Sequence, residues 1–177
     1  RVLFRSVKAE PPSYDMHATN SYAVMHFVAQ HYSTLLTFDW KNFPKLEGDL
    51  AESWSMSDDG LSYTFKLHKG VKFHDGTPFT SEDVKASYER LRNPPEGVTS
   101  VRKALFASIS SIETPDDHTV VFKLSSPDAF MMDGFASPFN AIYSAKDLAA
   151  DPTFPVKNVN GTGPYRSEEH TSELQSP

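Results

Sequence analysis

Residues 50–92 read LAESWSMSDDGLSYTFKLHKGVKFHDGTPFTSEDVKASYERLR and contain the clearest structural signals in this 177-residue chain. Ser57–Gly60 predicts a tight turn, because aspartate and glycine favour turns and glycine accepts a positive φ. From Ser62 to His68, polar and apolar residues alternate, which indicates a half-buried strand. Lys69–Gly70 then turns the chain into a second short strand, Val71–Phe73.

The rest of this stretch predicts another turn and a capped helix. Asp75–Gly76 begins the turn, and Thr80 is a good N-cap for a helix from Ser81 onward. Asp83 favours the positive end of that helix. Three apolar residues are spaced to form its buried face: Val84, Tyr88 and Leu91. Asn93–Pro95 stops the helix.

Before this stretch, the sequence predicts a turn, a helix and a connection. Pro11 and Pro12 exclude a helix from the entry segment. Asn20 or Ser21 can cap a helix that runs to about Leu35. Leu46–Glu52 then forms a short connection to the alternating region.

After this stretch, the sequence predicts a second hairpin and a short helix. The hairpin pairs Ile109–Glu113 with Thr119–Leu124 through a turn at Pro115–Asp117. Ser144 caps a helix that ends at Ala150.

The composition is that of a water-soluble globular protein, with 38% hydrophobic and 12% aromatic residues. A net charge of -6 argues against a nucleic-acid-binding domain, which normally presents a basic face. The chain has no cysteine, so it has no thiol nucleophile, cysteine metal site or disulfide. Its apolar runs, such as Ala23–Met25, are too short to cross a bilayer.

The two ends of the chain can be encoded by the same DNA read in opposite directions. Arg166–Thr171 can be written AGA TCG GAA GAG CAC ACG, whose reverse complement translates as the first six residues, RVLFRS. We therefore expect residues 1–6 and 166–177 to be translated sequencing adapter, with Arg166 ambiguous, and we exclude both ends from fold reasoning.

The order of turns, strands and helix resembles the family 5 extracellular solute-binding proteins, the peptide- and nickel-binding subunits of bacterial ABC importers. The residues that carry the resemblance are Trp54, Asp59–Gly60, Lys69–Phe73 and Asp75–Gly76. Asn160–Tyr165 adds to it, since the family has a similar Gly-Thr-Gly-Pro-aromatic phrase where the chain returns to its first lobe.

The resemblance implies an α/β fold, part of a type II periplasmic-binding-protein fold with an inserted α+β subdomain. Residues 7–45 would begin lobe one, 46–150 would form the inserted subdomain, and 151–165 would return to lobe one. The rest of lobe one, the hinge and the whole second lobe would lie outside this chain. Apolar surface would be exposed where the missing strands pair.

The resemblance also implies a function without a chemical reaction. A di- or oligopeptide, or another small solute, would be captured between two lobes and delivered to an ABC permease in the membrane. The protein would be a monomer without a cofactor, located in the periplasm or anchored outside the cytoplasmic membrane. Its signal peptide would lie outside this chain.

Seven residues match the family's cleft edge and are the candidate ligand contacts: Asn20, Ser21, Tyr22, Met25, Arg102, Ser137 and Asn140. Arg102 would bind a ligand carboxylate through its planar fork, or be a solvated charge on a helix face. Six aromatic residues fit core positions: Trp54, Tyr63, Phe65, Phe73, Tyr88 and Phe122. Four others could line the cleft or the core: Tyr22, Phe130, Phe135 and Phe139.

Two other functions remain open. A metal-dependent hydrolase could use His68, His74 and Asp75, since imidazole and carboxylate bind zinc or iron. These residues lack the helical spacing that aligns two histidines, and Asp75 also fits a turn. Gly161–Gly163 lacks the lysine and helix of a phosphate loop, and fits a tight crossover better. A sensor domain that hands its ligand to a receptor is the other alternative.

Overall fold

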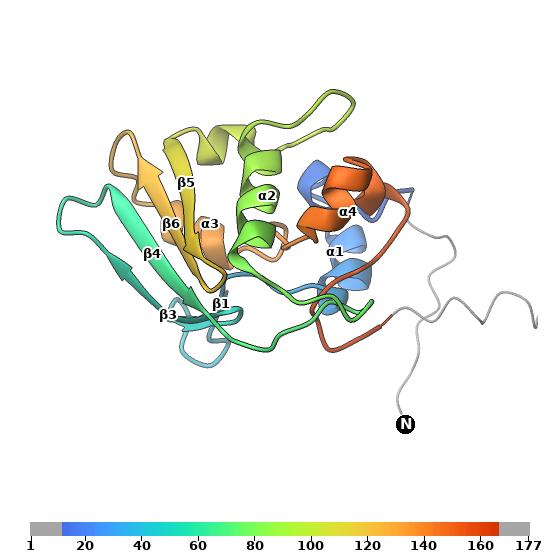
Figure 1. Ribbon diagram of the computed structural model, residues 1–177, viewed down its shortest axis with the longest axis horizontal. Helices are drawn as coiled ribbons and strands as arrows, with labels where there is room; N and C mark the ends of the chain where they lie inside the picture. Colours follow the sequence, from blue (N-terminus) through green and yellow to red (C-terminus); the bar gives the residue numbers. More distant parts are fainter. Residues whose placement is uncertain (1–11, 167–177) are drawn as a thin grey trace, which may run out of the picture.

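A four-stranded sheet and the helix α2 that covers it form the centre of the molecule, with α1 and α4 on the other side of α2 (Figure 1). The structure, a computed structural model, describes residues 12–166. The predictions for residues 1–6 and 167–177 fall outside this range. Within it, no helix is long and apolar enough to cross a membrane.

The sheet is antiparallel throughout, with strand order β3-β4-β6-β5. Its strands are β3 (Ala51–Met56), β4 (Ser62–Leu67), β5 (Ile109–Asp116) and β6 (Thr119–Leu124). The hairpin β3–β4 and the predicted hairpin β5–β6 therefore lie side by side, with β4 and β6 at the centre. In this central pair Phe65 is opposite Val120, and Tyr63 is opposite Phe122.

The remaining elements are a small hairpin and short helices. The hairpin pairs β1 (Leu36–Phe38) with β2 (Leu46–Gly48). The α-helices are α1 (Tyr22–Val28), α2 (Ser81–Arg92), α3 (Met131–Ala136) and α4 (Ala145–Ala150). Four 3-10 helices complete the described elements: Met16–Ala18, Ala29–His31, Lys103–Phe106 and Phe154–Val156.

The turns, the alternating strand and the helix cap that were predicted in the opening stretch are confirmed. Gly60 and Gly76 adopt positive φ angles of 68° and 88°, as the two turns require. Tyr63, Phe65 and Leu67 are buried along β4. Thr80 and Asp83 form a reciprocal capping box at the start of α2, in which the Asp83 carboxylate accepts from the Thr80 backbone N–H at 2.7 Å.

Four expectations about secondary structure are wrong. Val71–Phe73 is not a strand, because its only pairing is an isolated bridge between Lys72 and Pro78. Leu46–Glu52 is not a plain connection, since it contains β2 and the start of β3. Strand β2 forms because it pairs with β1, which lies outside the segment Leu46–Glu52.

The helix predicted to reach Leu35 ends much earlier, and the second hairpin turns later than expected. Helix α1 stops at Val28, after which one 3-10 turn leads into extended chain. Leu35 is buried, but in the same hydrophobic cluster as the sheet. Strand β5 continues to Asp116, with a register shift between Glu113 and Asp116, so Pro115 and Asp116 are strand and the turn is formed by Asp117 and His118.

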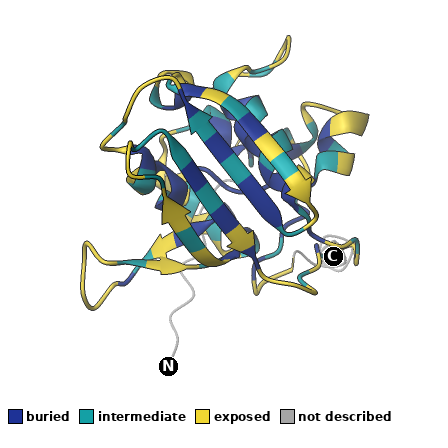
Figure 2. Ribbon diagram, turned by 60° about the vertical axis from the view of Figure 1, so that its left-hand side comes forward, coloured by how far each residue is buried: buried dark blue, intermediate teal, exposed yellow. Residues whose placement is uncertain are grey.

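Aromatic side chains fill the core between the sheet and the helices, and the central strands alternate between buried and less buried positions (Figure 2). Tyr88 on α2 packs edge-on against Phe106, Phe122 and Phe135, with ring centroids 5.0 to 5.5 Å apart. Of the six aromatics predicted as core, Trp54 alone is half-buried and the other five are buried. Phe135 also belongs to the core.

A buried network of Asp15, His17, Arg90 and Tyr143 joins the entry segment to α2. Arg90 donates to both carboxylate oxygens of Asp15, at 3.1 and 2.6 Å. Tyr143 accepts from the Met16 backbone N–H at 2.8 Å, and its hydroxyl lies 3.3 Å from Asp15 Oδ1. Each of the four side chains is at most 4% exposed. The network therefore satisfies the charge that it buries.

Replacing Tyr88 and Tyr143 by phenylalanine should have opposite effects on stability. The Tyr88 hydroxyl is buried and has no hydrogen-bond partner among residues 12–166, so Tyr88→Phe should leave the free energy of unfolding unchanged or raise it by about 1 kcal/mol. Tyr143→Phe removes a bonded hydroxyl and should lower it by about 1–3 kcal/mol. Urea unfolding measures both, and a large loss in Tyr88→Phe would show that its hydroxyl is bonded.

The pH dependence of stability should report the burial of His17. Burial, and then the nearby Arg90, lower the pKa of His17 from 6.5 to about 3. The unfolded chain binds a proton near pH 6.5 that the folded protein excludes, so stability should fall as the pH drops below 6.5. The slope approaches about 1.4 kcal/mol per pH unit.

Urea titrations at pH 6.5 and pH 5 should therefore show a loss of about 2 kcal/mol in the wild type that His17→Gln lacks. His26→Gln, on an exposed position of α1, is the matched control and should keep the wild-type loss. An undiminished loss in His17→Gln would mean that His17 is not its source.

Candidate functional site

Four residues predicted or considered for the ligand cleft meet on one surface. We call Asn20, Tyr22, Arg102 and Phe139 the Tyr22 surface. The Tyr22 and Phe139 rings meet edge-on with centroids 6.1 Å apart, and the Arg102 guanidinium carbon lies 4.5 Å from the Phe139 centroid. Tyr22 is 69% exposed, so the surface offers an open aromatic ring to solvent.

Three separate chain segments supply the Tyr22 surface. Asn20 precedes α1 and Tyr22 is its first residue, so the start of that helix fixes both. Arg102 ends the loop after α2, immediately before a 3-10 helix. Phe139 lies in the loop that follows α3. No segment alone could have revealed this meeting point.

Arg102 is half-buried and hydrogen-bonded within the protein. Its guanidinium donates to the backbone oxygen of Met16 at 3.1 Å, to that of Thr19 at 2.6 Å and to the side chain of Asn20 at 2.8 Å. Burial lowers the pKa of Arg102 below its usual range. The guanidinium is therefore held by the segment before α1 and is not fully solvated.

The other predicted contacts lie around this surface at different depths. Ser21 is exposed, and Met25, one turn further along α1, is half-buried. It packs against a second hydrophobic cluster on the α1 and α4 side of α2, whose members include Val24, Val28 and Leu148. Ser137 follows α3 and is half-buried. Asn140 is fully buried, and its side-chain N–H donates to the Gly134 carbonyl at 2.7 Å. Its side-chain oxygen has no partner within residues 12–166.

The residues proposed for metal-dependent hydrolysis do not form a metal site. Among residues 12–166, no three His, Cys, Asp or Glu side chains are placed to hold a metal ion. Asp75 instead accepts from the backbone and hydroxyl of Thr77, at 2.9 and 2.6 Å. These contacts hold the pKa of Asp75 below its usual value. The Asp75 carboxylate therefore stabilises the turn, as the sequence suggested.

His74 binds the chain where it crosses beside α1. Its Nε2 donates to the Gly163 carbonyl at 2.8 Å, and its backbone N–H donates to the Gly161 carbonyl at 2.9 Å. Gly163 in turn donates its N–H to the His31 carbonyl at 3.0 Å. A side chain at Gly161 would lie 1.9 Å from that same carbonyl oxygen. Backbone therefore packs on backbone in this tight crossover, which no side chain larger than hydrogen could enter.

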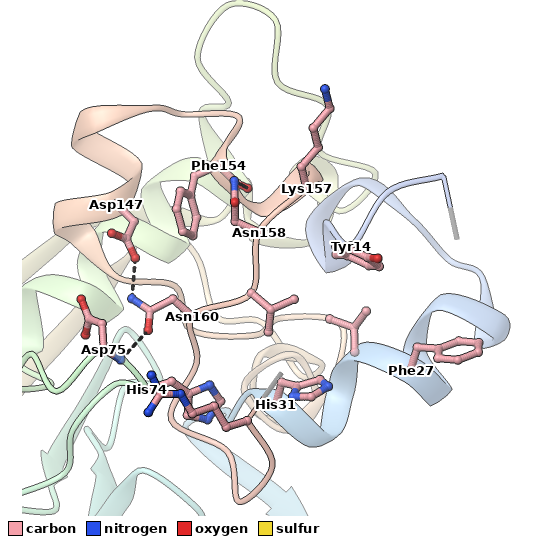
Figure 3. Close-up of a pocket in the computed structure, with 13 residues that line it drawn as sticks. Tyr14, Phe27, His31, His74, Asp75, Asp147, Phe154, Lys157, Asn158 and Asn160 are labelled. Atoms are coloured by element: carbon pink, nitrogen blue, oxygen red, sulfur yellow. Dashed lines mark hydrogen bonds between the residues drawn. The ribbon is translucent and has the colours of Figure 1, made fainter. Parts of the chain in front are cut away.

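A cavity lies elsewhere, beside α1 and the segment 154–160 (Figure 3). It has a volume of about 960 Å³ and is open to solvent. Asn160 bridges its wall, donating to Asp147 at 2.6 Å and accepting from the Asp75 N–H at 3.2 Å. None of the seven predicted ligand contacts lines this cavity.

The network behind the Tyr22 surface was missed by sequence reasoning. His17 accepts a hydrogen bond from the Val101 N–H through its carbonyl oxygen at 3.2 Å, beside the Arg102 contacts. Asp15 and Arg90 are 75 positions apart. A buried arginine in the helix pattern was the one available signal, because Arg90 lies one residue before Leu91 on the buried face.

Comparison with known proteins gives a consistent family. Residues 45–174 match the family described as bacterial extracellular solute-binding proteins, family 5 Middle. A putative ABC transporter peptide-binding protein of Brucella ovis is 37% identical over 153 residues, which are 83% of this chain and 28% of that protein. The probable D,D-dipeptide-binding periplasmic protein DdpA of Escherichia coli is 36% identical over 165 residues, 89% of this chain and 31% of DdpA.

Solved structures show the same fold. The periplasmic binding protein AgaA of A. tumefaciens R10, in complex with agropinic acid, superposes with a TM-score of 0.82 at 34% identity. The match covers 92% of this chain and 32% of AgaA. The described α/β structure is thus part of a type II periplasmic-binding-protein fold, as expected, and the chain spans less than a third of the length of the curated relatives it matches.

Proposed function

This chain belongs to the family 5 bacterial extracellular solute-binding proteins, and we propose from that premise that its full-length protein captures a di- or oligopeptide for an ABC importer. The protein would act outside the cytoplasm, as a monomer, and deliver its ligand to a membrane permease. It would carry out no reaction itself, bind no nucleic acid and need no cofactor. The similarity to two proteins named as peptide or dipeptide binders carries this proposal.

The Tyr22 surface supports a role in ligand contact. It combines an exposed aromatic ring with polar groups at its margin, which suits a ligand whose side chains vary. A peptide backbone can be bound like an added strand, while its side chains lie in roomy, hydrated pockets. We propose that Asn20, Ser21, Tyr22, Met25 and Ser137 form the part of the cleft edge that this chain contributes.

Closure of two lobes would supply the selectivity. A closed form is stabilised only when a ligand completes contacts with both lobes, so the ligand shifts the population from open to closed. This chain would contribute one wall, and the opposite wall would come from the remainder of the full-length protein. Its relatives are more than three times the matched length, which leaves ample chain for that wall.

An opine is the second candidate ligand class. The structural relative AgaA was solved with agropinic acid, and its match to this chain is as extensive as those of the peptide binders. Opines and peptides both carry carboxylates on flexible carbon chains, so the described wall alone favours neither. Calorimetric titration of the full-length protein with both classes separates them. Binding of an opine, with no binding of any peptide of two to five residues, would contradict the peptide proposal.

Tyr22→Ala in the full-length protein should weaken ligand binding about tenfold, since loss of an exposed aromatic contact of this kind costs about 1.4 kcal/mol. Phe43→Ala is the matched control, because Phe43 is 73% exposed but lies in the β1–β2 hairpin. It should leave the dissociation constant unchanged. Equal effects of the two substitutions on affinity would remove the Tyr22 surface from the cleft.

A further inference from the structure

Arg102 contacts three oxygen atoms that all belong to the segment just before α1. The backbone oxygens of Met16 and Thr19 and the side-chain oxygen of Asn20 lie 2.6 to 3.1 Å from its terminal nitrogens. The neighbouring residue adds a fourth contact, because the Val101 N–H donates to the His17 carbonyl at 3.2 Å. Two consecutive loop residues thus hold residues 16–20.

The hydrogen-bond pattern leaves no edge of the guanidinium free to receive a carboxylate. A guanidinium has five N–H groups and binds a carboxylate through two parallel ones. Both such edges include Nη2, one with Nε and the other with Nη1. Nη2 of Arg102 donates to Thr19 and to Asn20, so both of its hydrogens are already engaged.

The flat face of the guanidinium is also engaged. It lies over the Phe139 ring at 4.5 Å, and Phe139 meets Tyr22 edge-on. Arg102 therefore connects the segment before α1, its own loop and the loop after α3. Removing it would free the Tyr22 and Phe139 rings from a common support.

We propose that Arg102 is a positioning residue that fixes Asn20 and Tyr22 against Phe139 and does not bind the ligand carboxylate. This inference rests on the proposed function for its effect on affinity, but the positioning itself does not depend on what the ligand is. A ligand carboxylate would then be bound by residues outside the Tyr22 surface. Lysine cannot replace Arg102 here, because a single ammonium lacks the planar fork that reaches several oxygens in one plane.

The test uses the full-length protein with Arg102→Lys and Arg102→Met, and Lys103→Met as the matched control at the exposed neighbouring position. The probes are trialanine and its C-terminal amide, which lacks the carboxylate. Positioning predicts that both arginine variants weaken the two probes by the same factor, about tenfold, and that Lys103→Met weakens neither. Adding Tyr22→Ala to Arg102→Met should produce no further loss, because Arg102 acts through Tyr22.

Amide hydrogen exchange gives a readout that needs no ligand. Exchange at residues 16–22 should rise at least tenfold in both arginine variants, while α2 and the central strands keep their wild-type protection. A loss of affinity at least ten times greater for trialanine than for its amide would overturn the proposal, because it would place the carboxylate on Arg102. Unchanged exchange at residues 16–22 would overturn it equally.

Failure of the proposed function would look different. If the wild-type protein bound neither probe and no other peptide, the peptide assignment would fall, while the exchange measurement would still decide the role of Arg102. If Arg102→Met did not fold, Arg102→Lys and Asn20→Ala would take its place. Asn20→Ala removes one of the three acceptor oxygens and should raise exchange at the same residues by a smaller factor.

Discussion

The buried pair of Asp15 and Arg90 is the contact on which the arrangement of the described segments depends. Arg90 donates to both oxygens of Asp15 and also to the Pro152 carbonyl, so one side chain holds the entry segment, α2 and the segment after α4. Removing one partner of such a pair typically costs about 3–5 kcal/mol, because the other charge stays buried and unpaired. This contact therefore fixes the position of the two hydrophobic clusters, one on each side of α2, relative to each other.

The Tyr22 surface follows from this placement. Arg90 holds Asp15, and the residues that follow Asp15 contact Arg102. The aromatic rings of Tyr22 and Phe139 then meet at the end of that segment. The framework residues Asp15, His17, Arg90 and Tyr143 are buried, whereas the Tyr22 ring faces solvent. Buried groups that need not touch a ligand thus hold the Tyr22 surface in place.

Short-range chemistry explains what could be predicted from sequence. The turn at Gly60, the alternation in β4 and the capping box of Thr80 each depend on residues a few positions apart, and each was predicted correctly. Two features that were missed depend on residues far apart in the sequence. Strand β2 exists because β1 pairs with it, and Arg102 finds acceptors more than 80 positions away. The family resemblance pointed to Arg102, but its actual partners could not be read from spacing.

The tight crossover at Gly161–Gly163 bears on how a two-lobed protein of this family would move. Two passes of backbone touch there without intervening side chains, and His74 binds across them. No side chains lie between the two backbone segments at this contact. The segments therefore cannot slide past each other by changing side-chain rotamers. If the full-length protein opens and closes as proposed, the chain near His31 and the returning chain would move as one rigid unit, and segments away from this point would bend.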